Sequence, residues 1–178
     1  RLLRQTDVGD WAQQNNIDLL KPENSLDLIG KIENLDLVLT IGYGVLLPEQ
    51  ILALPKHGFL NLHFSLLPAY RGAAPAQRAL LNGETITGVT VFKLDIGMDT
   101  GPIYSQQSLS IEPNWRSFEL LRELSQLGPS AVSEAFELIE NGIEPTAQAG
   151  IASIAPKITK TEAKIDFKLN AASIVNAI

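Results

Sequence analysis

A nearly continuous apolar run, residues 35–41, limits the possible folds more than any other feature of the sequence. The run is short, has Val, Thr and Ile among its last four residues, and stops at Gly42. Such a run is typical of a strand that is buried on both faces of a parallel sheet. Pro48 then stands where a helix begins, and residues 58–63 alternate as in a second strand. Strands that alternate with helices indicate an α/β fold with a mainly parallel sheet and flanking helices.

The rest of the chain predicts a hairpin followed by a helical region. Residues 87–95 and 103–111 have the pattern of strands joined by the glycine-bounded loop 96–101. Helices are predicted over residues 25–32, 75–82, 117–127 and, after a break at Gly128-Pro129, up to Asn141. Residues 143–168 have a weaker pattern, which is typical of an ordered linker, and Asn170 then has the character of a helix N-cap.

Composition excludes several classes of function. The chain has no cysteine, so disulfide scaffolds, thiolate metal sites and cysteine nucleophiles are excluded. Its net charge of −6 makes it a poor stand-alone binder of nucleic acid. No apolar run reaches the ~18–20 residues that cross a bilayer. The N-terminus lacks the layout of a signal peptide, so we expect a cytoplasmic protein with no membrane partner.

Both ends predict a piece of a longer protein. The chain starts at Arg1, has Met98 as its single methionine, and stops at Ile178 within an apolar-rich stretch. A helix that begins after Asn170 would be cut after about two turns. We therefore expect a chain that is truncated at both ends, and a complete small protein with a processed start is the alternative.

Asn61 and His63 form the densest group of polar residues that could take part in catalysis. They are two residues apart on a predicted strand, so both side chains leave the same face. In α/β sheets ligands bind at the carboxyl ends of the strands, where this pair is expected. An amide and an imidazole together can donate to one developing negative oxygen, and a neutral imidazole can act as a base. The alternative is that both side chains only form hydrogen bonds with neighbouring main-chain groups at the end of a strand.

Asp95 and Asp99 are the next candidates, in the glycine-bounded hairpin loop. One of these carboxylates would face His63 if the loop folds over the strand end, and it would then favour the imidazolium and orient the ring. Asp and Gly are also common in solvated turns, and the residues alone favour that simpler interpretation. No G-x-S-x-G, G-x-G-x-x-G or P-loop pattern is present to suggest other chemistry.

Four motifs carry a resemblance to a known family. They are Asn61-Leu-His-Phe-Ser-Leu-Leu-Pro68, Tyr70-Arg-Gly-Ala-Ala-Pro-Ala-Gln77, Thr87-Gly-Val-Thr90 and Asp95-Ile-Gly-Met-Asp-Thr-Gly101. With them the chain closely resembles the methionyl-tRNA formyltransferases, within the wider superfamily of 10-formyltetrahydrofolate transferases. The resemblance implies a Rossmann-like fold and a catalytic trio of Asn61, His63 and Asp99. It also implies a folate-holding segment formed by Ser65, Leu66, Leu67 and Pro68.

The implied enzyme transfers a formyl group from 10-formyltetrahydrofolate, its co-substrate, to the amino group of initiator methionyl-tRNA, without a metal. A tetrahedral intermediate would place negative charge on the formyl oxygen. Asn61 and His63 would stabilise that charge, and Asp99 would hold the His63 ring and help to relay a proton. The resemblance thus implies folate and initiator tRNA as partners, and we expect a monomer. Phe92 stands where glycinamide formyltransferases usually have a histidine, which counts against glycinamide ribonucleotide as the acceptor; an amino-sugar nucleotide is a further alternative.

Relative to that family, the chain departs at both ends. The resemblance implies that the opening strand–helix–strand portion and the basic C-terminal domain are missing. It also implies that a loop that contacts tRNA is missing in whole or large part. We therefore expect residues 1–155 to form the formyltransferase catalytic domain without its N-terminal portion. Residues 156–178 would be a linker and the start of a missing domain. A folate-binding piece without activity is the alternative function.

Overall fold

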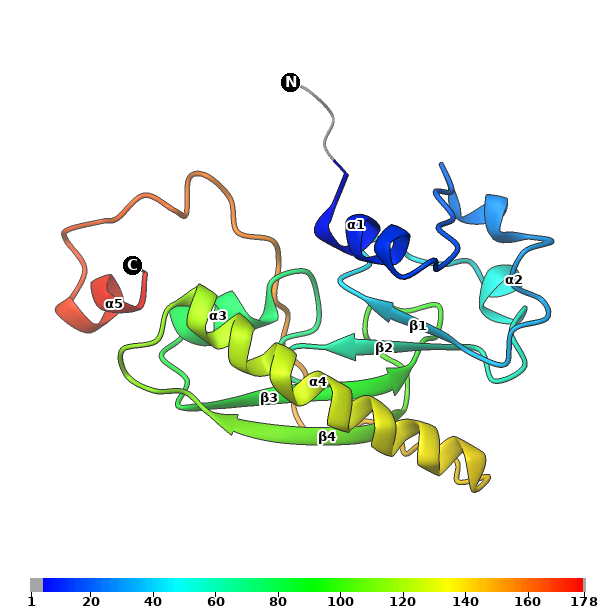
Figure 1. Ribbon diagram of the computed structural model, residues 1–178. Helices are drawn as coiled ribbons and strands as arrows, with labels where there is room; N and C mark the ends of the chain where they lie inside the picture. Colours follow the sequence, from blue (N-terminus) through cyan, green and yellow to red (C-terminus); the bar gives the residue numbers. More distant parts are fainter. Residues whose placement is uncertain (1–4, 178) are drawn as a thin grey trace.

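The computed structural model describes residues 5–177 and shows within them a mixed sheet flanked by helices (Figure 1). The sheet contains, side by side in chain order, β1 (Val38–Ile41), β2 (Phe59–His63), β3 (Ile86–Lys93) and β4 (Ile103–Ser110). The predicted α/β class, the flanking helices and the hairpin of β3 and β4 are confirmed.

The expected predominance of parallel pairing needs a correction. β1 and β2 pair in parallel, whereas β2 with β3 and β3 with β4 pair antiparallel. The segment between β2 and β3 stays at the carboxyl end of β2 instead of crossing the sheet, since His63 lies opposite Thr90 and the start of β3 extends beyond it. A short loop then joins β3 to β4, and such a loop can connect only antiparallel neighbours.

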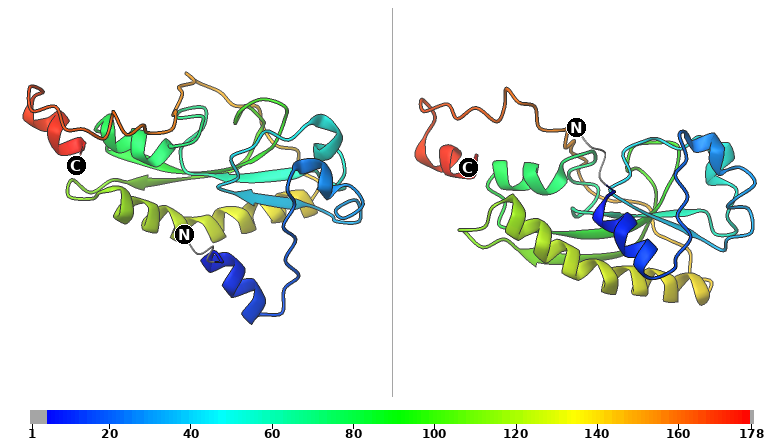
Figure 2. Two further views of the ribbon diagram at one scale, coloured as in Figure 1. Left: turned by 90° about the horizontal axis from the view of Figure 1, so that it is seen from above. Right: turned by 45° about the horizontal axis from the view of Figure 1, so that its top comes forward.

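One long helix, α4 (Ser117–Glu140), packs against β3 and β4 (Figure 2). The predicted break at Gly128-Pro129 is wrong, because the helix continues through both residues. Gly128 permits close packing instead of ending the helix: a Cβ there would lie 2.8 Å from Cδ2 of Leu62 in the sheet. Pro129 removes one main-chain hydrogen bond, and burial of apolar side chains such as Leu124 against the sheet offsets that loss.

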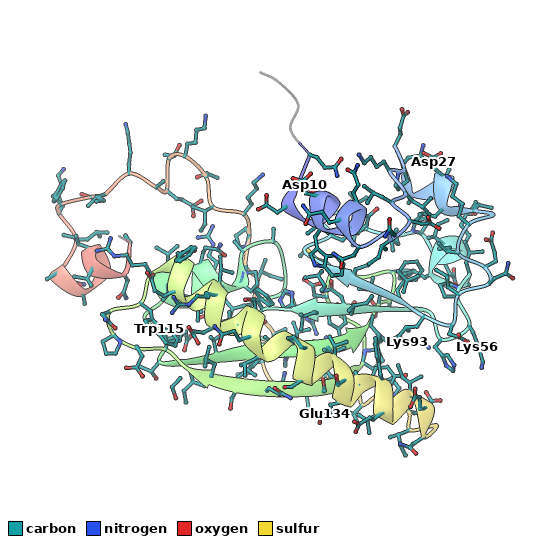
Figure 3. The ribbon with its side chains drawn as sticks, viewed as in Figure 1. Asp10, Asp27, Lys56, Lys93, Trp115 and Glu134 are labelled. Carbon is teal, nitrogen blue, oxygen red and sulfur yellow. The ribbon has the colours of Figure 1, made fainter. Side chains whose placement is uncertain are left out.

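β2 is the central element for the candidate site, and all five of its residues are buried. Leu60 and Leu62 join the apolar core beneath α4, the long helix that crosses in front of the sheet in Figure 3. Phe59 belongs to a second apolar cluster together with Ile51 of α2 (Glu49–Leu52). The predicted alternation is therefore confirmed, and it places Asn61 on the same side of the strand as Phe59, away from α4.

The remaining helices are short. They are α1 (Asp7–Gln14), the 3₁₀ turn η1 (Ser25–Leu28), α3 (Pro75–Leu81) and α5 (Ala171–Asn176). The helix predicted over residues 25–32 is thus limited to η1, because the chain turns at Gly30, whose φ is +81°. Asn170 is the N-cap of α5 as predicted, and its side chain accepts a hydrogen bond from the Ser173 amide. Within residues 5–177, no helix has the length and apolar character that a bilayer crossing requires.

Candidate active site

A cavity of about 440 Å³ opens at the carboxyl ends of β1 and β2. It is lined by the loop that follows β1, residues 42–47, by Asn61 and His63 of β2, and by parts of segments 72–77 and 95–99. The cavity therefore lies where ligands bind in open α/β sheets. Its volume falls within the range of small-molecule sites, about 300–1,000 Å³.

Asn61 is held by a neighbour on the adjacent strand. Thr40 of β1 lies directly opposite Asn61 in the parallel register, and its hydroxyl donates to Oδ1 of Asn61 at 2.9 Å. The same hydroxyl lies 3.0 Å from the carbonyl oxygen of Leu60. Because the amide oxygen is engaged, the amide N–H groups of Asn61 are left to donate to a ligand in the cavity. No sequence motif marks Thr40, and only the pairing of β1 with β2 reveals its role.

His63 is oriented by a main-chain carbonyl. Its Nε2 lies 2.9 Å from the carbonyl oxygen of Tyr70, and a carbonyl only accepts, so Nε2 carries the proton and Nδ1 of the neutral ring is free to accept one. The ring is 6% exposed and contacts Phe92 edge to face. Burial lowers the pKa of His63, although the Asp99 carboxylate and the Tyr70 carbonyl act in the opposite direction. The net lowering of the His63 pKa favours the neutral ring, in which Nδ1 can accept a proton.

Asp99 faces His63 because the hairpin loop does fold over the strand end. Its Oδ2 lies 3.8 Å from Nδ1 of His63 and accepts a hydrogen bond from the Gly72 amide at 2.7 Å. Asp99 has a φ of +54°, a left-handed conformation that non-glycine residues adopt rarely. Asp95 is different: it is exposed, and it accepts from Gly97 and Thr100 within its own turn. The simpler interpretation, a solvated turn, thus suits Asp95 and not Asp99.

The four residues expected to hold a folate do not line the cavity. Ser65 is fully buried, and its hydroxyl donates to the carbonyl oxygen of Ala69 at 2.6 Å. The amide of Leu67 donates to the Thr90 hydroxyl, which in turn donates to the carbonyl oxygen of Ser65. Leu66 lies against Gly88, where a Cβ would come within 2.6 Å of its Cδ2. These contacts, with Pro68 in the same turn, make the segment a support for the loop that presents the Tyr70 carbonyl to His63.

No cluster of three or more His, Cys, Asp or Glu side chains suited to a metal ion occurs among residues 5–177. The groups that converge on the cavity are an amide, an imidazole and a carboxylate. Together they can donate to a negative oxygen, accept a proton and stabilise the resulting positive charge.

The lowered pKa of His63 predicts that acidification reduces stability. A histidine with a lower pKa in the folded than in the unfolded chain takes up a proton on unfolding. The contribution of His63 to the free energy of unfolding is complete above the ordinary histidine pKa of about 6.5. It falls as the pH drops from there toward the pKa of the folded state. Between about pH 7.5 and about pH 5.5, the free energy of unfolding measured in urea should therefore decrease more for the wild type than for His63→Gln. Equal losses in the two proteins would contradict this assignment.

The chain is similar to several known proteins. A family model described as "Formyl transferase" matches residues 10–136. The methionyl-tRNA formyltransferase of Thermodesulfovibrio yellowstonii is 40% identical over 99% of this chain and 59% of its own length. That of Salinispora tropica is 40% identical over 93% of this chain and 56% of its own. The chain thus spans a little more than half the length of these relatives.

A solved structure shares the fold. The N-formyltransferase from Helicobacter canadensis, in complex with folinic acid and dTDP-3-aminofucose, aligns with a TM-score of 0.79 at 25% identity. The alignment covers 95% of this chain and 61% of that one. The similarity therefore extends over nearly all the elements described above.

Proposed function

The chain belongs to the formyl transferase family, and from this we propose that it transfers the formyl group of 10-formyltetrahydrofolate to the amino group of initiator methionyl-tRNA. The observation that carries the proposal is the meeting of Asn61, His63 and Asp99 around one cavity. The expected catalytic residues are therefore these three, and the contacts of each support the role proposed for it below.

The folate co-substrate would occupy the cavity described above. The loop that follows β1, residues 42–47, offers main-chain groups and the apolar side chains of Val45, Leu46 and Leu47 to a flat ring system. The Helicobacter canadensis enzyme, which shares the fold, is in complex with folinic acid, and this supports a folate as the co-substrate. Ser65, Leu66, Leu67 and Pro68 would act indirectly in this arrangement, by supporting the loop behind His63.

Asn61 and His63 would act at the formyl carbon in sequence. As the amine attacks and a new C–N bond forms, negative charge develops on the formyl oxygen, and the Asn61 amide donates to it. Nδ1 of His63 takes the proton that the amine loses, because Nε2 is committed to the Tyr70 carbonyl. Once protonated, His63 is stabilised by Asp99, 3.8 Å away, and can donate to the same oxygen. When the bond between the formyl carbon and the folate nitrogen breaks, the proton passes from His63 to that nitrogen, and tetrahydrofolate leaves.

The acceptor is assigned from the relatives. Both enzymes described above at 40% identity are methionyl-tRNA formyltransferases, whereas the Helicobacter canadensis enzyme, solved with an aminated sugar nucleotide, is 25% identical. Initiator methionyl-tRNA is therefore the preferred acceptor, and an amino-sugar nucleotide is the second candidate. Glycinamide ribonucleotide has less support, because the expected histidine is replaced by the buried Phe92.

A direct assay tests this function. The chain is incubated with 10-formyltetrahydrofolate and, in parallel reactions, with initiator methionyl-tRNA, an amino-sugar nucleotide or glycinamide ribonucleotide. We expect formyl-methionyl-tRNA, detected by gel mobility and mass spectrometry. Folate binding without formylation of any acceptor would replace the proposal with the alternative of a folate-binding piece without activity.

Thr40 provides a test of how Asn61 is positioned. Thr40→Val keeps the shape of the side chain but removes the hydroxyl that holds Oδ1 of Asn61. We expect kcat to fall by about tenfold, which corresponds to the loss of about one hydrogen bond, with little change in the KM for the folate. Thr40→Ser retains the hydroxyl and should keep most of the rate. If valine and serine lower kcat equally, the hydroxyl does not position the amide.

A further inference from the structure

The side-chain amide of Gln148 forms hydrogen bonds only with residues that support the candidate site. Gln148 lies 12 residues beyond the segment that the family model matches. Its Nε2 donates to the carbonyl oxygen of Asp99 at 2.9 Å and to that of Gly101 at 2.8 Å. Its Oε1 accepts from Nε and Nη2 of Arg71, at 3.1 and 2.6 Å. Two donated and two accepted bonds saturate a primary amide. Gln148 does not line the cavity, so it is free of direct contact with a ligand there.

One end of Gln148 holds Asp99. The main chain of Asp99 is in a left-handed conformation, with its carbonyl bound to Gln148 and its carboxylate bound to the Gly72 amide. Residues outside the preferred backbone regions stay there only when several contacts fix them. Gln148 supplies two such contacts, because it also binds the carbonyl of Gly101 at the end of the same loop.

The other end of Gln148 holds the segment that orients His63. Arg71 stands between Tyr70, whose carbonyl accepts from His63, and Gly72, whose amide donates to Asp99. The main chain of Arg71 is itself fixed to residues 153 and 155 by hydrogen bonds of 2.8 and 2.6 Å. Gln148 thus connects the segment that orients the His63 imidazole with the loop that positions the Asp99 carboxylate.

We propose that Gln148 is a positioning residue, which sets the separation of Asp99 from His63 by joining their two supporting segments. The proposal deepens the proposed function and rests on it for its catalytic meaning. Its structural content stands separately, since it concerns the approach of two groups of this chain. Gln148 acts through Asp99 and not on the substrate.

The chemistry of the bridge requires an amide. Gln148→Glu keeps the shape and the acceptor for Arg71 but aims a second acceptor at the carbonyl oxygens of Asp99 and Gly101. Gln148→Met has a similar length and makes neither set of hydrogen bonds. The first variant repels the loop at one end, and the second releases the bridge at both ends without adding charge.

The pKa of His63, measured by NMR, reports the position of Asp99 without an activity assay. The chain has two histidines, so His57 gives an internal reference signal. The Asp99 carboxylate raises the pKa of His63 against the effect of burial. If Gln148→Met lets Asp99 move away by about 2 Å, the pKa of His63 should fall by about one pH unit. In an Asp99→Asn background the same substitution should leave that pKa unchanged.

Kinetics provide the second measurement, in the protein with its folate and acceptor. Both Gln148 variants should lower kcat by about 10- to 100-fold, with less than about a threefold change in the KM for the folate, because Gln148 does not touch the cavity. Gln126→Glu on the exposed face of α4 makes the same chemical change away from the site and should have wild-type rates.

The results separate this proposal from the proposed function. A lowered His63 pKa with no formyl transfer in the wild type would support the positioning role and reject the proposed activity. An unchanged His63 pKa in folded Gln148→Met, checked by circular dichroism, would overturn the positioning role. Equal losses of kcat from Gln148→Met with and without Asp99→Asn would also overturn it, because Gln148 would then act independently of Asp99.

Discussion

Replacing His63 with alanine is expected to reduce the rate of formyl transfer by about 10²- to 10⁴-fold, the range typical for loss of a general base. The imidazole is the group at the cavity whose free ring nitrogen can take a proton near neutral pH, because Nε2 is bound to the Tyr70 carbonyl and burial lowers the pKa. The loss should appear in the rate constant of the chemical step, measured in single-turnover reactions with saturating folate. Binding of the folate should change much less.

His57→Ala is the matched control for this substitution. His57 is the second histidine of the chain and does not line the cavity. Because His63→Ala also leaves the Tyr70 carbonyl oxygen without its donor, it should cost about 1–3 kcal/mol of stability. Thermal unfolding must therefore show that the variant is folded at the assay temperature. A folded His63→Ala protein with more than about a tenth of the wild-type rate would remove His63 from the proton transfer.

The fold was predictable from sequence where the signal was local. The alternation in residues 58–63 correctly separated Leu60 and Leu62 from Phe59 and Asn61, because each strand face packs against one apolar cluster. The hairpin of β3 and β4 followed from two strand patterns and a glycine-bounded loop. Local patterns do not specify strand direction, so the antiparallel pairing of β2 with β3 needed the structure.

Gly128-Pro129 shows a second limit of local signals. Glycine at the end of a helical pattern commonly marks its C-terminus, yet here the missing Cβ serves contact with Leu62. The two uses of glycine look identical in the sequence. Only the distance between helix and sheet distinguishes them.

The candidate site was predictable in its side chains but not in its supports. Asn61 and His63 could be paired from their spacing. For Asp99 the residues alone favoured a solvated turn, and only the resemblance placed it with the other two, before the structure showed its loop over the strand end. The groups that decide the geometry are mostly main-chain atoms, such as the Tyr70 carbonyl and the Gly72 amide. Every residue has the carbonyl and every residue except proline has the amide N–H, so no residue type indicates them. Ser65 was assigned to a folate-holding segment only through the family resemblance, and the structure adds that its hydroxyl donates to the Ala69 carbonyl oxygen within a turn.

Replacing Asn61 with aspartate is expected to lower kcat by about 10³-fold, the upper end of the range for loss of one oxyanion donor. The substitution is nearly isosteric, and a carboxylate oxygen still accepts from the Thr40 hydroxyl, so the side chain should keep its place. The side-chain atom that faces the cavity changes, because aspartate presents a negative oxygen instead of an N–H to the charge that develops on the formyl oxygen. Single-turnover rates at saturating folate measure this loss.

Asn114→Asp, at an exposed position away from the cavity, makes the same change and should retain the wild-type rate. A charged Asp at position 61 also predicts a pH signature, because a protonated carboxyl can donate where the charged form cannot. The ratio of wild-type to Asn61→Asp rates should therefore shrink as the pH falls. If the ratio is small and constant with pH, Asn61 does not donate to the formyl oxygen, and the charge must be stabilised by another group, such as protonated His63.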